Sequence, residues 1–167
     1  MRRRLFLAAI PAALVAGCGF RLRRVEGMPF STLYVDAPAG SAVAQRIRSS
    51  LARSGHTRLA EPASEAEAVL RLSEEVRSKA ILALSGAGRV TEYRLGLQLT
   101  YSVSGTAGGV LAANETIELN RDMTYDDAQV LAKGAEERLL YRDMEDSAAR
   151  RILRRLQAIS PGDGGEP

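Results

Sequence analysis

The clearest pattern along the chain is a strict alternation of apolar and polar side chains between residues 90 and 104. Tyrosines, leucines and a valine fill every second position, while polar side chains such as Glu92, Arg94 and Gln98 lie between them. A half-buried antiparallel strand produces this period of two. Weaker alternation predicts three further strands, over residues 32–37, 68–79 and 110–121.

Two of the weaker strands carry glutamates that interrupt their apolar face. We expect Leu72 and Val76 to point inward from one strand, with Glu74 breaking the face between them. In the last strand, Glu115 falls on the predicted inner face and is out of character there. The apolar residues predicted on that face are Leu111, Ala113, Ile117 and Leu119.

A period near four marks two helices. Val43, Ile47 and Leu51 predict a helix over residues 41–53, with Gly55 placed to end it in a left-handed cap. A longer helix is predicted from about residue 127 to residue 159, after the acidic start signal at Asp126 and Asp127. Its predicted apolar stripe consists of Leu131, Ala135, Leu139, Leu140, Met144, Ala148, Ile152, Leu156 and Ile159.

The order of these elements is strand, helix, three strands, helix. It predicts one α+β domain over residues 31–160, a two-layer sandwich with two helices packed on one face of a four-stranded, mostly antiparallel sheet. We expect residues 81–88 to form a hairpin connection and residues 161–167 to form a disordered tail. The polar face of such a sheet is left to water or to a partner.

The first eighteen residues have the features of a secretory precursor. Arg2, Arg3 and Arg4 precede an apolar run from Leu5 to Ala16, which is shorter than the roughly 20 residues of a membrane-spanning helix. The run ends in Val-Ala-Gly-Cys, which resembles a bacterial lipobox with Cys18 as the acylated residue. The alternative is an ordinary signal peptide followed by an incidental cysteine.

The lipobox implies removal of residues 1–17 and a lipid anchor at Cys18, followed by a tether over residues 18–30. Gly19 follows the cysteine where an inner-membrane lipoprotein commonly has aspartate, so we expect the periplasmic face of the outer membrane. Arg3-Arg4 within the segment RRLFL also resembles a twin-arginine export motif, and the sequence leaves the export route open.

Composition narrows the possible functions further. Three of the 23 basic side chains precede Cys18, so the mature chain has 20 basic and 20 acidic residues and no net charge to favour nucleic acid. Apolar content of 46% and charged content of 26% are typical of a globular domain. With a single cysteine and a single histidine, a Cys/His metal cluster is excluded, and no cofactor is expected.

Three stretches of the mature chain form a joint pattern: CGFRLR from Cys18, VTEYRL from Val90 and RDMTYD from Arg121. The last is followed by Val130-Leu131-Ala132-Lys133, Glu136-Glu137, Leu140 and Met144. In this order and spacing, from Cys18 to about Leu156, the chain resembles the LPS-assembly lipoproteins of the LptE family.

The resemblance implies a non-enzymatic subunit that lies as a plug inside the outer-membrane β-barrel LptD. Members of the family help the barrel to fold and help to deliver lipopolysaccharide to the outer leaflet. The resemblance implies more basic residues on the last strand than this chain has, since Glu115 and Glu118 lie there. This departure weakens the case for direct lipopolysaccharide binding through that strand.

Arginines are the candidate contacts for lipopolysaccharide phosphates or for the partner. Arg89 and Arg94 flank the start of the long strand and Arg121 ends the next, so a hairpin can bring them together. The alternative is that they are ordinary solvated charges. A second group lies near the end of the long helix: Arg150, Arg151, Arg154 and Arg155. Interaction with the helix dipole accounts for these four, and binding to acidic groups of a lipid or a partner is the alternative.

The sequence gives little support for a catalytic function. Glu92 with Glu115, or Glu136 with Glu137, is not placed to converge, and no nucleophile motif accompanies His56. Two rival functions remain: a periplasmic lipid-binding lipoprotein without a barrel partner, and a lipid-anchored hydrolase that uses Glu92 or His56. Among the tyrosines, Tyr93 and Tyr101 are predicted in the core, while Tyr34 and Tyr125 are candidates for partner contact.

Overall fold

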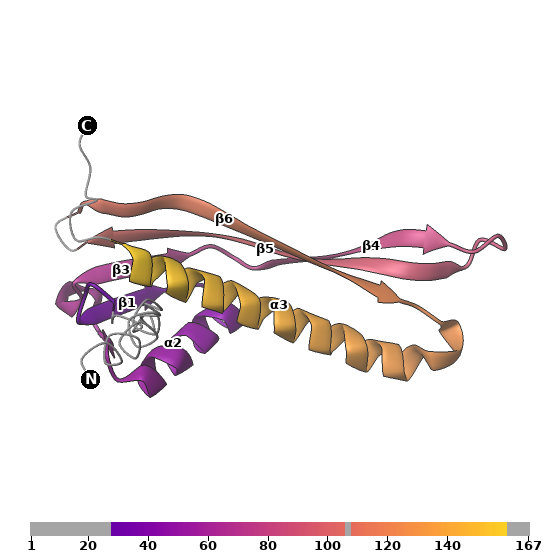
Figure 1. Ribbon diagram of the computed structural model, residues 1–167, viewed down its shortest axis with the longest axis horizontal. Coiled ribbons are helices and arrows are strands. Elements are labelled where there is room, and N and C mark those ends of the chain that lie inside the picture. The colour runs from indigo at the N-terminus through magenta and orange to yellow at the C-terminus, as the bar shows by residue number, and fades with distance from the viewer. Residues whose placement is uncertain (1–27, 106–107, 160–167) are drawn as a thin grey trace, which may run out of the picture.

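The computed structural model describes residues 28–105 and 108–159, which form two layers (Figure 1). The predictions for the signal peptide, Cys18, the tail and most of the tether lie outside these residues. Of the predicted tether, residues 28–30 are described, and Phe30 is buried in the core. None of the helices in these two ranges is both long and apolar enough to cross a membrane.

The elements follow one another as β1 (Thr32–Asp36), α2 (Ala42–Ser54), β2 (Arg58–Leu59), β3 (Ala68–Leu72), β4 (Val76–Leu84), β5 (Val90–Gly105), β6 (Val110–Thr124) and α3 (Val130–Ala158). Short 3-10 turns cover Ala63–Glu65 and Asp127–Gln129.

The sheet is organised around β5, which has neighbours along both of its edges. β6 pairs antiparallel along one edge; on the other, β4 pairs with the first half of β5 and β3 with its last residues. β1 lies parallel to both β2 and β3. The α+β class with two helices is confirmed. The prediction of a four-stranded, mostly antiparallel sheet was too simple, because the sheet of the described residues has six strands and contains both parallel and antiparallel pairs. β2 has only two residues, too few to show an alternation.

One predicted strand is two strands, β3 and β4, because the chain bends between them. Glu75 leaves the sheet at the bend and caps helix α2, its Oε1 accepting from the backbone N–H of Val43 at 2.9 Å. The bend changes the phase of the alternation, so Val76 lies opposite Gln98 on the outer face and is 56% exposed. The prediction that Val76 points inward was therefore wrong.

The strands β4, β5 and β6 form a long arm that extends beyond the N-terminal end of α2, with α3 beneath it (Figure 1). β4 runs to Leu84, well into the segment 81–88 that was predicted as a connection. The turn between β4 and β5 therefore occupies only residues 85–89.

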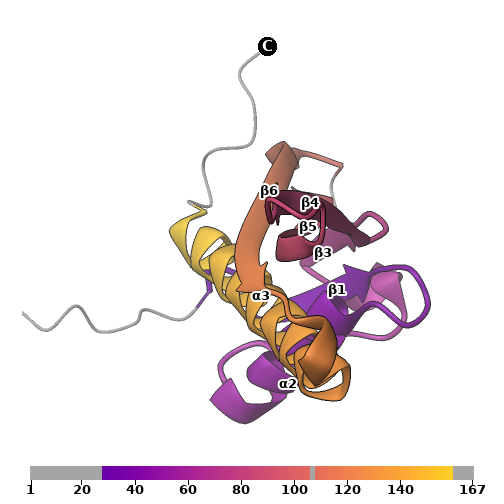
Figure 2. The same cartoon turned by 90° about the vertical axis from the view of Figure 1, so that its right-hand side faces the viewer.

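Helices α2 and α3 cover one face of the sheet, as the end-on view shows (Figure 2). The Ser41 hydroxyl caps α2 at its start, and Gly55 ends it in the left-handed conformation with φ 67°, as the sequence predicted. Val43, Ile47 and Leu51 are all buried, so the predicted apolar face of α2 is confirmed.

The apolar stripe of α3 is confirmed only in its C-terminal half. Met144, Ala148 and Ile152 are buried, but Leu131 and Leu139 are 87% and 58% exposed. At 100° per residue, Leu131 and Leu139 both lie about 140° around the helix from Met144. The row Leu131, Ala135 and Leu139 is one residue out of step with the row that runs from Leu140 to Leu156, so it lies off the buried face.

The strand β6 contains an irregularity that explains its unusual inner face. Tyr101 pairs with Glu115 and Val103 pairs with Ala112, so β6 has one more residue than β5 between these two pairs, a β-bulge. Ala112 is buried and Ala113 is exposed, contrary to the prediction. Beyond the irregularity, Ile117 and Leu119 are buried as expected.

Candidate interaction surfaces

The face of the arm that points away from the helices is polar. Opposed outward pairs on β5 and β6 are Arg94–Asp122, Gly96–Asn120, Gln98–Glu118 and Thr100–Thr116. The hydroxyls of Thr100 and Thr116 lie 3.1 Å apart, within hydrogen-bond distance. Along β5 and β6 this face thus offers mainly hydrogen-bonding groups to a partner, while the exposed Val76 adds an apolar side chain on β4.

The outer face is hollowed at Gly96. A depression of about 170 Å³ lies over this glycine, with Ser78 of β4 and Asn120 of β6 on either side. A Cβ at Gly96 would come within 2.3 Å of the Ser78 hydroxyl oxygen, so the close approach of the neighbouring side chains depends on glycine.

Arg94 is held flat on the outer face by Asp122. Its Nε donates to Oδ1 at 2.8 Å and its Nη2 donates to Oδ2 at 3.0 Å, a bidentate pair. The hydrogen bond from Arg94 holds the pKa of Asp122 below its ordinary value. Arg94 is therefore fixed in place, and a ligand would have to share it with Asp122.

Arg121 points to the opposite side of the hairpin from Arg94. It pairs in register with the buried Leu95, and its Nη2 donates to Asp143 of α3 at 2.8 Å. Arg89 lies exposed in the turn between β4 and β5. The hairpin therefore does not gather the three candidate arginines on one face, and their binding of a ligand stays a prediction.

Glu115 is satisfied on the inner face by two partners. Tyr101 donates its hydroxyl to Oε2 at 2.5 Å, and Arg155 of α3 donates to Oε1 at 2.8 Å. Both hydrogen bonds lower the pKa of Glu115, and the bond from Tyr101 has the larger effect. Burial raises the pKa of Tyr101. The glutamate that the sequence showed as out of character thus ties the hairpin to α3.

A second polar cluster joins the arm to the first half of α3. Lys79 of β4 donates to Glu137 at 2.6 Å, and this bond raises the pKa of Lys79. The ammonium lies 4.4 Å from the ring centre of Tyr93, which meets Tyr125 edge-on at 5.0 Å. Tyr93 and Tyr125 are both half-buried here, and the Lys79–Glu137 ion pair is one of several that join the arm to α3.

Glu145 is the most buried charge of the described residues, with a side chain 3% exposed. It accepts a hydrogen bond from Arg77 of β4 and forms an ion pair with Arg46 of α2 at 2.9 Å. One carboxylate thus joins α2, β4 and α3. The sequence carries no local signal for this contact, since Arg77 is 68 residues away.

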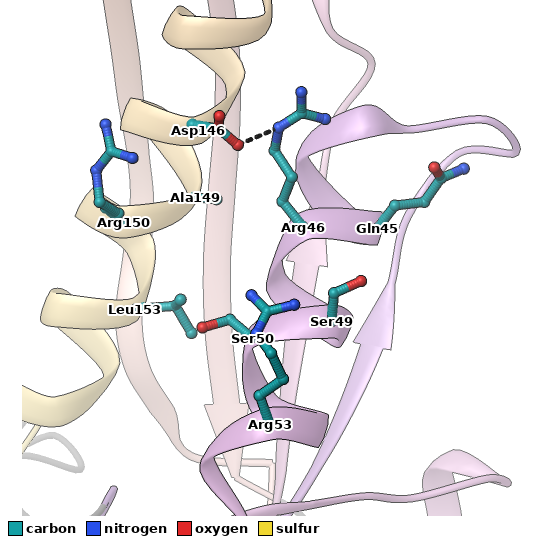
Figure 3. Close-up of a pocket in the computed structure, with 9 residues that line it drawn as sticks. All are labelled: Gln45, Arg46, Ser49, Ser50, Arg53, Asp146, Ala149, Arg150 and Leu153. Atoms are coloured by element: carbon teal, nitrogen blue, oxygen red, sulfur yellow. Dashed lines mark hydrogen bonds and ion pairs between the residues drawn. The ribbon is translucent and has the colours of Figure 1, made fainter.

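A groove of about 600 Å³ lies between α2 and α3 (Figure 3). The ion pair of Arg46 with Asp146 spans it near one end, and the Ser50 hydroxyl and the Arg53 side chain lie in the gap facing Leu153. Of the helix-end arginines, Arg150 lines this groove. The groove is polar and wide open rather than an enclosed site.

The groups considered for catalysis do not converge on a reactive centre. Glu92 lies on β5, while His56 follows α2 and its Nδ1 is 2.7 Å from the carbonyl oxygen of Ser54. Within the described residues, no group of three or more His, Cys, Asp or Glu side chains is placed to hold a metal ion.

Solved structures of bacterial lipoproteins share this fold. The solution structure of lipoprotein B from Nitrosomonas europaea is 34% identical, with a TM-score of 0.75 over 87% of this chain and 94% of that one. The crystal structure of rare lipoprotein B from Shewanella oneidensis is 26% identical, with a TM-score of 0.67 over 76% of this chain and 94% of that one. The fold thus places the chain among these bacterial lipoproteins.

Sequence comparison identifies one family within this group of lipoproteins. The model of the LptE lipopolysaccharide-assembly family matches residues 30–156. The LPS-assembly lipoproteins LptE of Photorhabdus laumondii and Pectobacterium atrosepticum are each 26% identical, over 95% and 96% of this chain and 88% and 89% of their own length. The chain belongs to the LptE family, as the resemblance implied.

Proposed function

We propose that this chain is a non-enzymatic assembly subunit that lies inside an LptD-type outer-membrane β-barrel and helps to deliver lipopolysaccharide to the outer leaflet. Membership of the LptE family supports this proposal. The observation that carries it is the polar outer face of β5 and β6, backed by a helical layer. Interiors of large outer-membrane barrels are polar, so such a face can be buried there with its hydrogen bonds satisfied.

The proposed anchor would set the place of action. Acyl chains on Cys18 would hold the domain at the periplasmic face of the outer membrane. Confining the domain to the membrane that holds the barrel raises the effective concentration of the domain near the barrel. Docking then needs no large apolar interface on the domain itself.

Lipopolysaccharide contact is proposed through the arginines of the arm. Arg89 is exposed at the turn and Arg94 is paired with Asp122, so we expect Arg89→Ala to reduce recovered lipopolysaccharide more than Arg94→Ala does. Arg121 is engaged by Asp143, and its substitution should act mainly on the packing of α3. Lipopolysaccharide bound to the purified protein would be measured for each variant.

The test of the barrel partner is purification of the tagged full chain from outer membranes in mild detergent. We expect a large, heat-modifiable β-barrel at equal stoichiometry. A photo-crosslinking residue at Thr116, on the outer face, should form more barrel adducts than one at Arg53, in the groove between the helices. A monodisperse protein that carries lipid and never recovers a barrel would favour the lipid-binding alternative and reject the plug.

A further inference from the structure

A pocket rich in arginine lies where the first turns of α2 meet the middle of α3. Its volume is about 310 Å³, and it opens to solvent between three elements. The lining residues are Arg46 from α2, Arg77 from β4, and Arg138, Tyr141, Arg142 and Glu145 from α3. Four guanidinium groups and one carboxylate thus line the pocket, and a second carboxylate, Asp146, pairs with Arg46 from outside the lining. Positive charge is therefore concentrated here, in a mature chain whose formal charge is zero.

One wall of the pocket is held rigidly. The buried Glu145 fixes both Arg46 and Arg77. The guanidinium of Arg77 also lies 5.3 Å from the ring centre of Tyr141, whose hydroxyl donates to the Ser78 carbonyl oxygen at 2.7 Å. These contacts place two arginines and an aromatic ring before any ligand arrives, which lowers the entropy cost of binding.

The other wall consists of Arg138 and Arg142, one helical turn apart on α3. Both are exposed, and neither forms an ion pair or hydrogen bond with any residue in the described ranges. The only carboxylate in the lining, Glu145, is already shared by Arg46 and Arg77. Two guanidiniums in the pocket therefore lack an anionic partner within its lining.

The nearby carboxylates on α3 are already paired, one of them with Arg46 of the pocket itself. Glu137 binds Lys79, Asp143 binds Arg121, and Asp146 binds Arg46. None of these three lines the pocket. The unmatched positive charge is therefore left for a ligand rather than for a side chain of the described fold.

We propose that this pocket binds a phosphoryl group. The guanidinium is planar, always charged and able to donate two parallel hydrogen bonds to phosphate oxygens. A tetrahedral phosphate can engage Arg138 and Arg142 while the fixed Arg77 contributes charge from the opposite wall. The site does not require the barrel partner, so it can be tested on the isolated protein.

The first test is calorimetric titration of the full chain, in uncharged detergent micelles at low salt, with inorganic phosphate and with pyrophosphate. We expect saturable binding that weakens as ionic strength rises. The double variant Arg138→Ala/Arg142→Ala should bind roughly tenfold more weakly or worse. The matched control, Arg151→Ala/Arg154→Ala, removes the same charge from exposed positions of the same helix and should stay within about twofold.

The source of the phosphate is tested with vesicles. Full chain would be floated with phosphatidylcholine vesicles that contain or lack phosphatidylglycerol. Enrichment on the anionic vesicles that is lost in Arg138→Ala/Arg142→Ala supports the site and assigns a lipid headgroup. Phosphate or pyrophosphate binding without such enrichment supports the site and assigns a soluble phosphate.

Folding is controlled by circular dichroism and by the melting temperature of each variant. Arg138→Lys/Arg142→Lys keeps the charge but loses the bidentate geometry, and it should bind more weakly than the parent while melting at the same temperature. Failure of both probes to bind, or equal loss in the pocket and control double variants, would overturn the proposal. Neither result bears on recovery of the barrel, so the two proposals fail separately.

Discussion

Tyr101 donates its hydroxyl to Glu115 across the hairpin, at 2.5 Å, with Arg155 of α3 on the other carboxylate oxygen. Tyr101 is buried, and burial raises its pKa well above the ordinary value, so the hydroxyl keeps its proton at neutral pH. A charged residue on the inner face of β6 is thereby satisfied by a strand neighbour and a helix. The contact links the two layers at the closed end of the hairpin.

The first prediction concerns the Tyr101 hydroxyl. Tyr101→Phe removes one hydrogen bond to a carboxylate and keeps the ring, so we expect a loss of about 1 kcal/mol of unfolding free energy. Urea unfolding followed by circular dichroism measures it. Tyr34→Phe is the matched control, because no hydrogen bond of the Tyr34 hydroxyl is formed within the described residues, and it should change stability little. Equal losses in the two variants would contradict the role of the contact.

The second prediction concerns pH. The pKa of Glu115 is lowered from 4.5 by its bonds to Tyr101 and Arg155. A carboxylate whose folded pKa is depressed stabilises the fold above its unfolded pKa, and this contribution disappears as pH falls through the folded value. The stability difference between the parent and Glu115→Gln should therefore be largest near neutral pH and shrink as pH falls below 4.5. Unfolding free energies measured across this range check it; a constant difference would refute the assignment.

Much of this fold was predictable because its signals are local. The alternation in β5 and the cap at Gly55 depend on neighbours in sequence, and both are confirmed. The phase of β6 was not predictable, because an extra residue between Ala112 and Glu115 shifts it and depends on pairing with another strand. The bend at Glu75 depends likewise on the start of a distant helix.

The candidate arginines show a different limit. The alternation along the two strands was enough to predict that Arg94 and Arg121 lie on opposite faces of the hairpin, since Arg121 is in phase with the buried Leu119. The arginine pocket on α3 had no such signal. Its partners Arg46 and Arg77 come from other elements, so only the tertiary structure brings them to Glu145.

The third prediction tests the buried face of α3. Ile152 is fully buried and Leu131 is 87% exposed on the same helix. Ile152→Ala should cost roughly 2–5 kcal/mol of unfolding free energy, because it leaves a cavity in the core. Leu131→Ala should change it by less than about 0.5 kcal/mol, as expected for surface substitutions. Thermal or urea unfolding gives both values, and a comparable loss in the two variants would restore the longer stripe predicted from sequence.

The fourth prediction concerns the buried carboxylate that joins three elements. Glu145→Ala leaves Arg46 and Arg77 without their shared acceptor, but their guanidiniums are partly exposed and water can solvate them. We therefore expect a loss of about 1–3 kcal/mol, below that for a fully buried pair. Glu137→Ala breaks the more exposed pair with Lys79 and is the control, with an expected loss under about 1 kcal/mol.

The two glutamate variants should also differ in where the protein loosens. Glu145 joins α2 and β4 to α3, so its removal should speed amide hydrogen exchange in the first turns of α2, which are far from the substituted residue in sequence. Removal of Glu137 should leave exchange in α2 unchanged, because its partner Lys79 lies on β4. Faster exchange confined to α3 in both variants would mean that Glu145 does not couple the two helices.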